Sequence, residues 1–351
     1  MQTEVGFGVP RMSKRERVDA AVQGHPVDRP PVAAWRHFVG QESNAPDLAR
    51  AMLSWLRDYD WDFLKVNPRW TYAVEAWGNR YDLNRYEGVS PALLHYVVQS
   101  PGDLAKIREL DPSIGPFEEQ LEAVSRIVRE VNGEAHVVQT VFSPLSYLTR
   151  LAGASGAQEG PDSGTFRLRE LVAADADALH AALGAIAATL ARYVKELLRV
   201  GADGVFFADV KFARSGQLTR EEYLKFGRPY DMEVMESLRG SIFNVLHLCG
   251  EGIYMDLFTD YPVQVVNWDV LGRGNPSLTE GQRVVSCAVA GSTGEAGTLQ
   301  TGTAEEVTEL VRRAVISTGG RRLIVAPGCS VKPPQSEANL RAFRRAVDMF
   351  L

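Results

Sequence analysis

Cysteine is scarce in this sequence. The 351 residues include three cysteines, Cys249, Cys287 and Cys329, an odd number in a long chain. This pattern argues against a disulfide framework and leaves metal binding or simple burial as their roles. No apolar run reaches the roughly 18 residues that a membrane span needs, and no signal-peptide pattern opens the chain. We therefore expect a cytoplasmic protein that contacts no membrane.

Long runs of one charge are also missing. Acidic residues number 44 against 38 basic ones, which gives a net charge of −6. No basic stretch is long enough to follow a phosphate backbone, and this argues against nucleic acid as the main partner. The hydrophobic share of 45% and the charged share of 23% are ordinary for a globular protein. The composition therefore suits a protein that acts on a small molecule.

Internal repeats and low-complexity blocks are absent from the sequence, so we expect one folded domain. Residues 1–11 show no periodic pattern and are predicted to form a flexible arm, followed by a single domain over residues 12–351. Ser13 and Glu16 have the spacing of a helix capping box. Residues 153–165 are rich in Gly and Ser and form either a lid or an inert surface connection.

Eight short apolar runs predict eight β-strands. They cover residues 31–38, 63–67, 137–142, 204–210, 244–249, 263–270, 284–292 and 321–329. Helical periodicity occupies stretches between them, such as 175–200 and 304–317. Several runs are apolar on both faces, as in parallel strands that lie between a core and covering helices. We therefore predict an α/β fold, a single (β/α)8 TIM barrel. A doubly wound open sheet is the runner-up, but the Gly-rich turn typical of it does not follow the first strand.

Polar side chains end most of these predicted strands. They are Arg36 and His37, Asn67 and Arg69, Asp209 and Lys211, His247 and Cys249, Asp269, and Cys329. In a barrel the carboxyl ends of the strands converge on one mouth, where polar residues are typical of an active site. The sequence therefore predicts an active site at that mouth.

The fifth predicted strand carries the most informative pair. His247 and Cys249 are two residues apart, so their side chains point to the same face, and Gly250 permits a sharp turn after them. Cys329 ends the eighth strand. Two cysteines and one histidine match a catalytic zinc site, which keeps one coordination position open. The alternative is that each cysteine is a small buried apolar residue, which is our interpretation of Cys287.

The chain resembles the uroporphyrinogen decarboxylase superfamily over nearly its whole length. The matching segments are residues 15–18, 26–32, 201–209 and 299–307. His247-Leu248-Cys249-Gly250 and Ala326-Pro327-Gly328-Cys329 are similar to the zinc-ligand motifs of its methylcobalamin:coenzyme M methyltransferase branch. The resemblance implies a zinc ion bound by His247, Cys249 and Cys329. It also implies a thiol that accepts a methyl group from a corrinoid on a partner protein, in a monomer or homodimer.

The sequence departs from both branches. The decarboxylase branch has an Arg pair in the first loop and an Asp after the second strand, whereas this chain has only Arg36 and, at the approximate place of the Asp, Arg69. A positive charge there would repel the cationic pyrrole intermediate. Residues 291–298 and the Arg36-His37 pair differ from the coenzyme M enzymes, so the acceptor thiol stays open. An anionic thiol with Arg36 or Arg69 as its counter-charge is one option.

The remaining polar residues receive roles as hypotheses. We assign Asp209, Asp269 and Arg36 as catalytic candidates, and His37, Asn67, Arg69 and Tyr72 as substrate-binding candidates. Asp209 either orients a metal-bound histidine or caps a helix, and Asp269 either supports the site or forms a salt bridge at the rim. The functional alternatives to a methyltransferase are a metal-free uroporphyrinogen decarboxylase and a corrinoid- or tetrapyrrole-binding barrel without catalysis.

Overall fold

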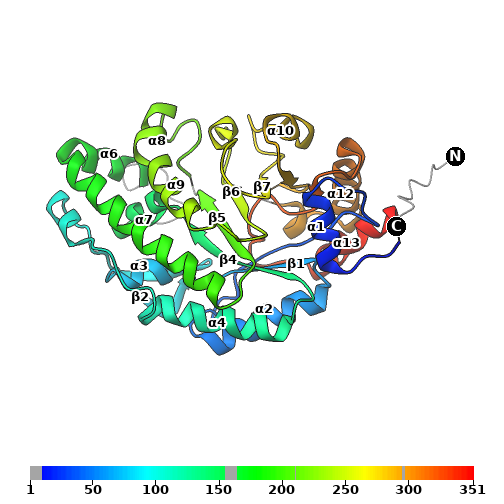
Figure 1. The fold of residues 1–351 in the computed structure, drawn as a ribbon, viewed down its shortest axis with the longest axis horizontal. Helices are drawn as coiled ribbons and strands as arrows, with labels where there is room; N and C mark the ends of the chain where they lie inside the picture. The colour runs from blue at the N-terminus through cyan, green and yellow to red at the C-terminus, as the bar shows by residue number, and fades with distance from the viewer. Residues whose placement is uncertain (1–9, 155–163, 210, 295–296) are drawn as a thin grey trace.

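A curled parallel β-sheet forms the centre of the molecule, shown in the computed structural model of Figure 1. The structure describes residues 10–154, 164–209, 211–294 and 297–351. The strand order is β1-β4-β5-β6-β7-β8-β9, and every neighbouring pair is parallel. The strands are β1 (Phe63–Val66), β4 (His136–Phe142), β5 (Gly204–Asp209), β6 (Val245–Leu248), β7 (Val265–Trp268), β8 (Ala288–Ala290) and β9 (Leu323–Ile324).

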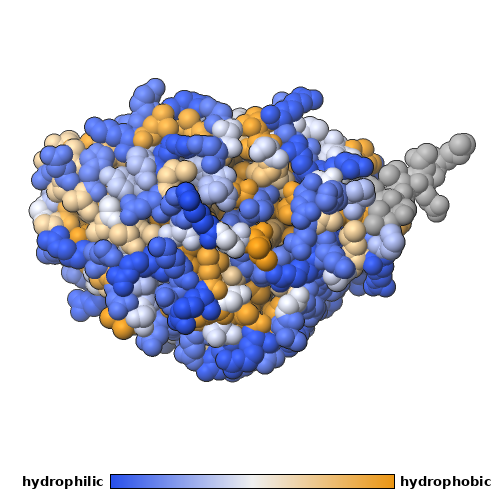
Figure 2. All heavy atoms as spheres, in the orientation of Figure 1, coloured by the Kyte–Doolittle hydropathy of each residue, from blue (hydrophilic) through white to orange (hydrophobic). Residues whose placement is uncertain are grey.

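Helices lie along the outside of this sheet (Figure 1), and the face shown in Figure 2 carries many hydrophilic residues with hydrophobic ones between them. The α-helices are α1 (Lys14–Val22), α2 (Ala45–Tyr59), α3 (Tyr72–Ala76), α4 (Gly115–Val131), α5 (Pro144–Leu151), α6 (Gly164–Ala174), α7 (Ala176–Arg199), α8 (Arg220–Phe226), α9 (Arg228–Glu236), α10 (Leu278–Val284), α11 (Thr298–Thr301), α12 (Ala304–Thr318) and α13 (Glu337–Ala346). Short 3-10 helices are η1 (Pro101–Lys106), η2 (Met255–Phe258) and η3 (Val347–Phe350). In α7 the buried residues Leu179, Leu183, Ile186 and Leu190 recur at helical spacing, which turns one apolar face inward.

Seven of the eight predicted strands occur in the sheet; six of them are shorter than predicted, and β4 begins one residue earlier. The remaining predicted strand, 31–38, which is the first in chain order, is not continuous. It makes isolated parallel bridges from Val32 to Val325 and from Arg36 to Val331. On its other side the Asp62 N–H donates to the Val32 carbonyl (2.9 Å). Prolines at positions 30 and 31 carry no N–H and so limit ladder formation here. The described sheet therefore has seven strands: the predicted α/β fold is confirmed, and the complete eight-stranded barrel is not.

One further expectation needs correction, and two others fall largely outside the described residues. The predicted strand 284–292 begins later, because Val284 ends helix α10 and β8 covers only three residues. The predicted arm 1–11 and the predicted lid 153–165 lie largely in residues 1–9 and 155–163, which the structure does not describe. The capping box of Ser13 and Glu16 is confirmed at the start of α1.

A β-hairpin that was not predicted stands beside the main sheet. It consists of β2 (Arg80–Glu87) and β3 (Ser90–His95), paired antiparallel. Gly88, with φ of +65°, forms the turn, a conformation that glycine adopts without strain. The Trp70 indole N–H donates to the Ser90 hydroxyl (3.0 Å), which ties the hairpin to the loop after β1.

A buried ion network fastens the N-terminal segment to the sheet. Arg17 pairs with Asp28 and with Asp62, and Arg29 also pairs with Asp62, each at 2.7 Å. Asp62 also accepts a hydrogen bond from the Val32 N–H (2.7 Å). All of these charges are buried. The network thereby holds the segment that leads to Trp35 and His37 against the start of β1.

No single helix among the described residues has the length and apolar composition needed to cross a membrane. One bent pair, residues 167–174 with α7, passes that test by length and composition only.

Candidate metal centre and active site

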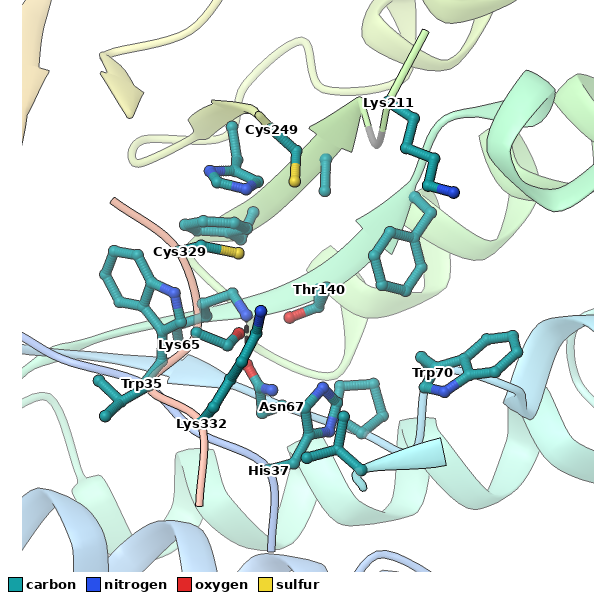
Figure 3. Close-up of a pocket in the computed structure, with 18 of the residues that line it drawn as sticks. Trp35, His37, Lys65, Asn67, Trp70, Thr140, Lys211, Cys249, Cys329 and Lys332 are labelled. Atoms are coloured by element: carbon teal, nitrogen blue, oxygen red, sulfur yellow. Dashed lines mark hydrogen bonds between the residues drawn. The ribbon is translucent and has the colours of Figure 1, made fainter. Parts of the chain in front are cut away.

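A cavity of about 460 Å³ opens at the carboxyl ends of the strands. Side chains from β1, β4, β5 and β6 and from the loop after β9 reach into it, as expected for this end of a parallel α/β sheet. Trp35, Trp70, Phe142 and Phe206 supply its aromatic walls. Figure 3 shows the sulfur atoms of Cys249 and Cys329 pointing into one end of the cavity, with Trp70 at the other.

His247, Cys249 and Cys329 form a group that could hold a metal ion. One ligand atom from each residue lies within 4.8 Å of the others. Zinc bonds of about 2.0–2.3 Å in a tetrahedron place ligand atoms about 3.5–4 Å apart, so a small inward movement would complete the site. Among the described residues this is the group of His, Cys, Asp and Glu side chains with metal-binding geometry.

The imidazole of His247 is held in the tautomer that a metal requires. Its Nδ1 lies 2.7 Å from the Asn267 side-chain oxygen. The Asn267 amide nitrogen donates to the carbonyls of Ala290 (3.0 Å) and Pro327 (3.1 Å), which fixes the amide orientation. The Asn267 oxygen must therefore accept, so Nδ1 carries the hydrogen and Nε2 keeps its lone pair for a ligand.

The two thiols of the group influence one another. Hydrogen bonding with Cys249, and to a smaller extent with His247, lowers the pKa of the Cys329 thiol well below its ordinary value. A lowered pKa favours the thiolate, which is the form that binds metals.

Gly250 has φ of +94°, and a Cβ there would lie 2.5 Å from an Arg214 nitrogen, so glycine is required after Cys249.

Cys287 lies apart from this group. It is half-buried just before β8, outside the cavity lining. Burial raises the pKa of its thiol to about 11, the opposite direction from Cys329. Its surroundings suit a protonated, packing cysteine.

The two aspartates proposed as catalytic are not bonded to His247 in the part of the chain that the structure describes. One Asp209 oxygen accepts from the Ala213 N–H (2.9 Å), and burial raises the pKa of this carboxyl to about 6. Asp269 accepts from the Leu271 N–H (2.9 Å) in the loop after β7 and does not line the cavity. Asn267 occupies the position behind His247 that we had considered for Asp209.

The other predicted residues divide into two sets. His37 and Asn67 line the cavity, whereas Arg36, Arg69 and Tyr72 do not. Arg69 is buried in ion pairs with Glu75 (2.9 Å) and Glu119. Its positive charge therefore faces carboxylates and not the cavity.

Arg36 and Tyr72 also point elsewhere. Arg36 donates to Gln335 (2.6 Å) and lies over the Phe38 ring at 4.6 Å. The Tyr72 hydroxyl donates to the Thr140 carbonyl (3.2 Å) in a fully buried position. Of the three aromatic residues Trp70, Tyr72 and Trp77 that follow β1, Trp70 lines the cavity.

Lys65 and Arg150 line the cavity and were missed by the sequence analysis. Lys65 precedes Asn67 by two positions on β1, bonds to its side-chain oxygen, and lies 4.5 Å from the centre of the Phe206 ring. Burial lowers the pKa of Lys65 to about 7. A charged residue within the apolar run 63–66, in phase with Asn67, was an available signal for Lys65. No comparable sequence signal pointed to Arg150, which lies inside the buried helix α5.

A family model described as "Uroporphyrinogen decarboxylase (URO-D)" matches residues 13–350. The chain belongs to this family. A uroporphyrinogen decarboxylase from a Synechococcus strain is 24% identical over 95% of the chain and 96% of the relative. The predicted family is thereby confirmed across nearly the whole sequence.

Solved structures extend the likeness in fold. A methyltransferase from Methanosarcina mazei superposes with a TM-score of 0.80 at 20% identity, covering 97% of this chain and 99% of that one. A B12-independent methionine synthase from a Shewanella strain gives a TM-score of 0.53 at 13% identity, over 91% and 96% of the two chains. At these identities the likeness shows a shared fold.

Proposed function

We propose that this family member is a zinc-dependent methyltransferase that moves a methyl group between a corrinoid and a thiol. The observation that carries the proposal is the group formed by His247, Cys249 and Cys329 at the end of the cavity. Two sulfur ligands and one nitrogen ligand are typical of a catalytic zinc site with one open position. The corrinoid, carried by a partner protein, would approach through the cavity mouth.

The residues around the group suit a zinc ion. Asn267 leaves Nε2 of His247 available, and hydrogen bonding lowers the pKa of the Cys329 thiol, the direction that favours the thiolate form that binds a metal. Zinc bound there would lower the pKa of a substrate thiol and so make it a nucleophile near neutral pH. The aromatic walls would reduce the access of water to the reacting sulfur, and the open side of the cavity would admit the substrate.

Uroporphyrinogen decarboxylase activity is the second candidate, because the curated relatives carry that name. Its cationic pyrrole intermediate needs a nearby negative charge. None of the described residues that line this cavity is an Asp or Glu, and Arg69, which we had matched to the decarboxylase aspartate, faces Glu75. The lack of a carboxylate in the described lining therefore counts against stabilisation of this intermediate in the cavity.

Metal analysis of three proteins tests the proposal. We expect about one zinc per chain in the wild type, purified without chelator, and loss of that zinc in Cys249→Ser. Cys287→Ser is the matched control, because its thiol lies outside the group and its loss should leave zinc unchanged. Methyl transfer from methylcobalamin to a panel of thiols should then require the bound zinc.

The outcomes separate the candidates. Zinc-dependent thiol methylation supports the proposal. A zinc-free wild type that releases carbon dioxide from uroporphyrinogen would replace it with the decarboxylase. Corrinoid or tetrapyrrole binding without any product would leave a barrel that binds the macrocycle and has no catalysis.

A further inference from the structure

Lys65 is a buried lysine in the wall of the cavity. It is 5% exposed, and its Nζ donates to the side-chain oxygen of Asn67, a neutral acceptor. No Asp or Glu lies among the described lining residues. Glu42 acts to raise the pKa of Lys65, but its carboxylate is itself bonded to His37 and to the Phe38 N–H. Within the described part of the chain, no carboxylate therefore pairs with the charge of Lys65.

The Lys65 side chain lies at the metal end of the cavity. Its Nζ is 4.5 Å from the centre of the Phe206 ring, and the imidazole of His247 packs against the same ring at 5.5 Å between centres. Figure 3 shows Lys65 near Cys329 and away from Trp70. Burial lowers the pKa of Lys65 to about 7, whereas the negative charge of Cys329 acts to raise it. Lys65 and the candidate metal ligands thus share one electrostatic environment.

The other cations of the lining are less well placed to act on a metal ion. Arg150 belongs to the far end, because its guanidinium lies 4.1 Å from the Phe142 ring centre and 4.9 Å from that of Trp70. Three further cations are not buried, so water screens their charge, and these are Lys211, Arg214 and Lys332. Lys65 is therefore the buried cation of the metal end.

The charge of the metal centre depends on its fourth ligand. Zinc held by two thiolates and a neutral imidazole carries no net charge, and a neutral fourth ligand leaves it so. A thiol loses its S–H proton to solvent when its sulfur bonds to the metal, and the centre then carries one negative charge. Opposite charges attract more strongly inside a protein than in water. A bound thiolate would thus supply the partner that Lys65 lacks.

We propose that Lys65 is a specificity-determining residue that makes the open position of the metal centre select an anionic ligand over a neutral one. This inference rests on the proposed function, because it needs a metal ion bound by His247, Cys249 and Cys329. The ammonium group would offset the charge of the thiolate complex without touching the metal. Thiolates would then be favoured over amines, thioethers and water, and the cost of burying Lys65 would fall when a thiolate binds.

Comparison of a thiol with a neutral ligand tests the inference without any turnover. The probes are mercaptoethanol and imidazole, each titrated into protein loaded with cobalt(II), whose absorption spectrum reports both complexes. We expect Lys65→Met to lower the preference for the thiol over imidazole by about 10- to 100-fold, because the imidazole complex gains no negative charge. Lys65→Arg keeps the positive charge and should retain most of the preference.

Lys225→Met is the matched control. Lys225 also lies over a ring, 5.1 Å from the centre of Phe226, but it is exposed and does not line the cavity. An unchanged preference in Lys225→Met together with a reduced preference in Lys65→Met supports the inference. The same preference in wild type and Lys65→Met overturns it.

The metal content of the same samples separates this inference from the proposed function. If the wild type binds cobalt and Lys65→Met shows the same preference for the thiol, the inference fails and the metal centre stands. If the wild type binds neither cobalt nor zinc, the proposed function fails, and the inference fails with it.

Discussion

At the scale of single residues, Asn267 determines how His247 can act. Its amide spans the ends of three strands: it accepts from His247 on β6, lies on β7 itself, and donates to the carbonyl of Ala290 on β8. A histidine without this partner could rotate or change tautomer, and either change would remove Nε2 from the metal position. The sequence marked His247 as a ligand but gave no indication of this supporting residue.

Replacing Asn267 should weaken metal binding without removing a ligand. In Asn267→Leu we expect zinc affinity to fall about 10- to 100-fold, because the imidazole loses its orienting partner. Asn267→Asp keeps an accepting oxygen and should lose less. Competition with a chromogenic chelator measures both constants, and equal affinities for wild type and Asn267→Leu would contradict this role.

Lys65 should lower stability in a pH-dependent manner. Burial lowers the pKa of Lys65 to about 7, below that of an unfolded lysine, so the unfolded chain binds more protons between about pH 7 and 10. The destabilisation is complete below pH 7 and is relieved as the pH rises through that window. We expect Lys65→Met to stabilise the metal-free protein by about 1–4 kcal/mol at pH 6.5 and by clearly less at pH 9.5.

Urea unfolding of metal-free wild type and Lys65→Met at the two pH values checks this. The quantity compared is the difference in unfolding free energy between the two proteins. A difference that stays the same at both pH values would show that the lysine is not held against its charged form.

At the scale of elements, the N-terminal segment depends on Asp62. This carboxylate lies just before β1 and binds Arg17 of α1, Arg29 and the Val32 N–H. The segment after Arg29 has only isolated bridges to its strand neighbours, so the ion network supplies much of its anchoring. Because Trp35 and His37 follow in the same segment, the network also positions one side of the cavity.

Removal of Asp62 should therefore be costly. Asp62→Ala leaves two buried arginines short of a partner, and we expect a loss of about 3–5 kcal/mol of unfolding free energy. Glu122→Ala is the comparison, since its exposed pair with Arg126 (2.6 Å) should contribute less than about 1 kcal/mol. Urea denaturation measures both, and similar small losses would count against the network.

Elements with a strong period could be predicted from the sequence, and those without one could not. The apolar runs of β4 and β5 and the helical pattern of α7 appear close to their predicted bounds. The hairpin β2–β3 has a polar strand with mostly half-buried or exposed residues, so no apolar alternation marked it. Segment 31–38 had the composition of a strand, but its outcome depends on proline and on neighbours distant in sequence.

The site shows the same division. Period two on one strand predicted that His247 and Cys249 share a face, and the position of Cys329 at another strand end brought it to them. Arg36, Arg69 and Tyr72 were predicted to act in the site but do not line the cavity. The geometry of the loops after the strands determines where these side chains point, and the sequence pattern does not reveal it. Arg150 and Asn267 depend on contacts across the fold, and such contacts leave no local pattern.

At the scale of the whole molecule, metal binding should be coupled to unfolding. The ligands are on β6 and after β9, about 80 residues apart, so a bound ion joins segments that separate in the unfolded chain. A ligand present at 100 times its dissociation constant stabilises the native state by about 2.7 kcal/mol. We expect zinc to raise the Tm of metal-free wild type by several degrees.

Two cysteine variants sharpen this measurement. Cys329→Ser should show little response to zinc, whereas Cys287→Ser should respond as the wild type does. Differential scanning calorimetry at several zinc concentrations provides the shift. A zinc response of Cys329→Ser equal to that of the wild type would show that the ion binds elsewhere.

The cavity is assembled from stretches that lie far apart in the chain. The candidate metal ligands fall between residues 247 and 329, whereas Lys65, Trp70 and Arg150 lie within the first 150 residues. Under the proposed function, residues 247, 249 and 329 would keep the reaction, and substitutions among the first 150 residues would change which substrate the cavity accepts. Proteins descended from one ancestor would then change their substrate specificity while they keep the same metal centre. The cysteine motifs alone would therefore group related sequences by type of reaction. Positions 65 and 150 would have to be compared separately to group them by substrate.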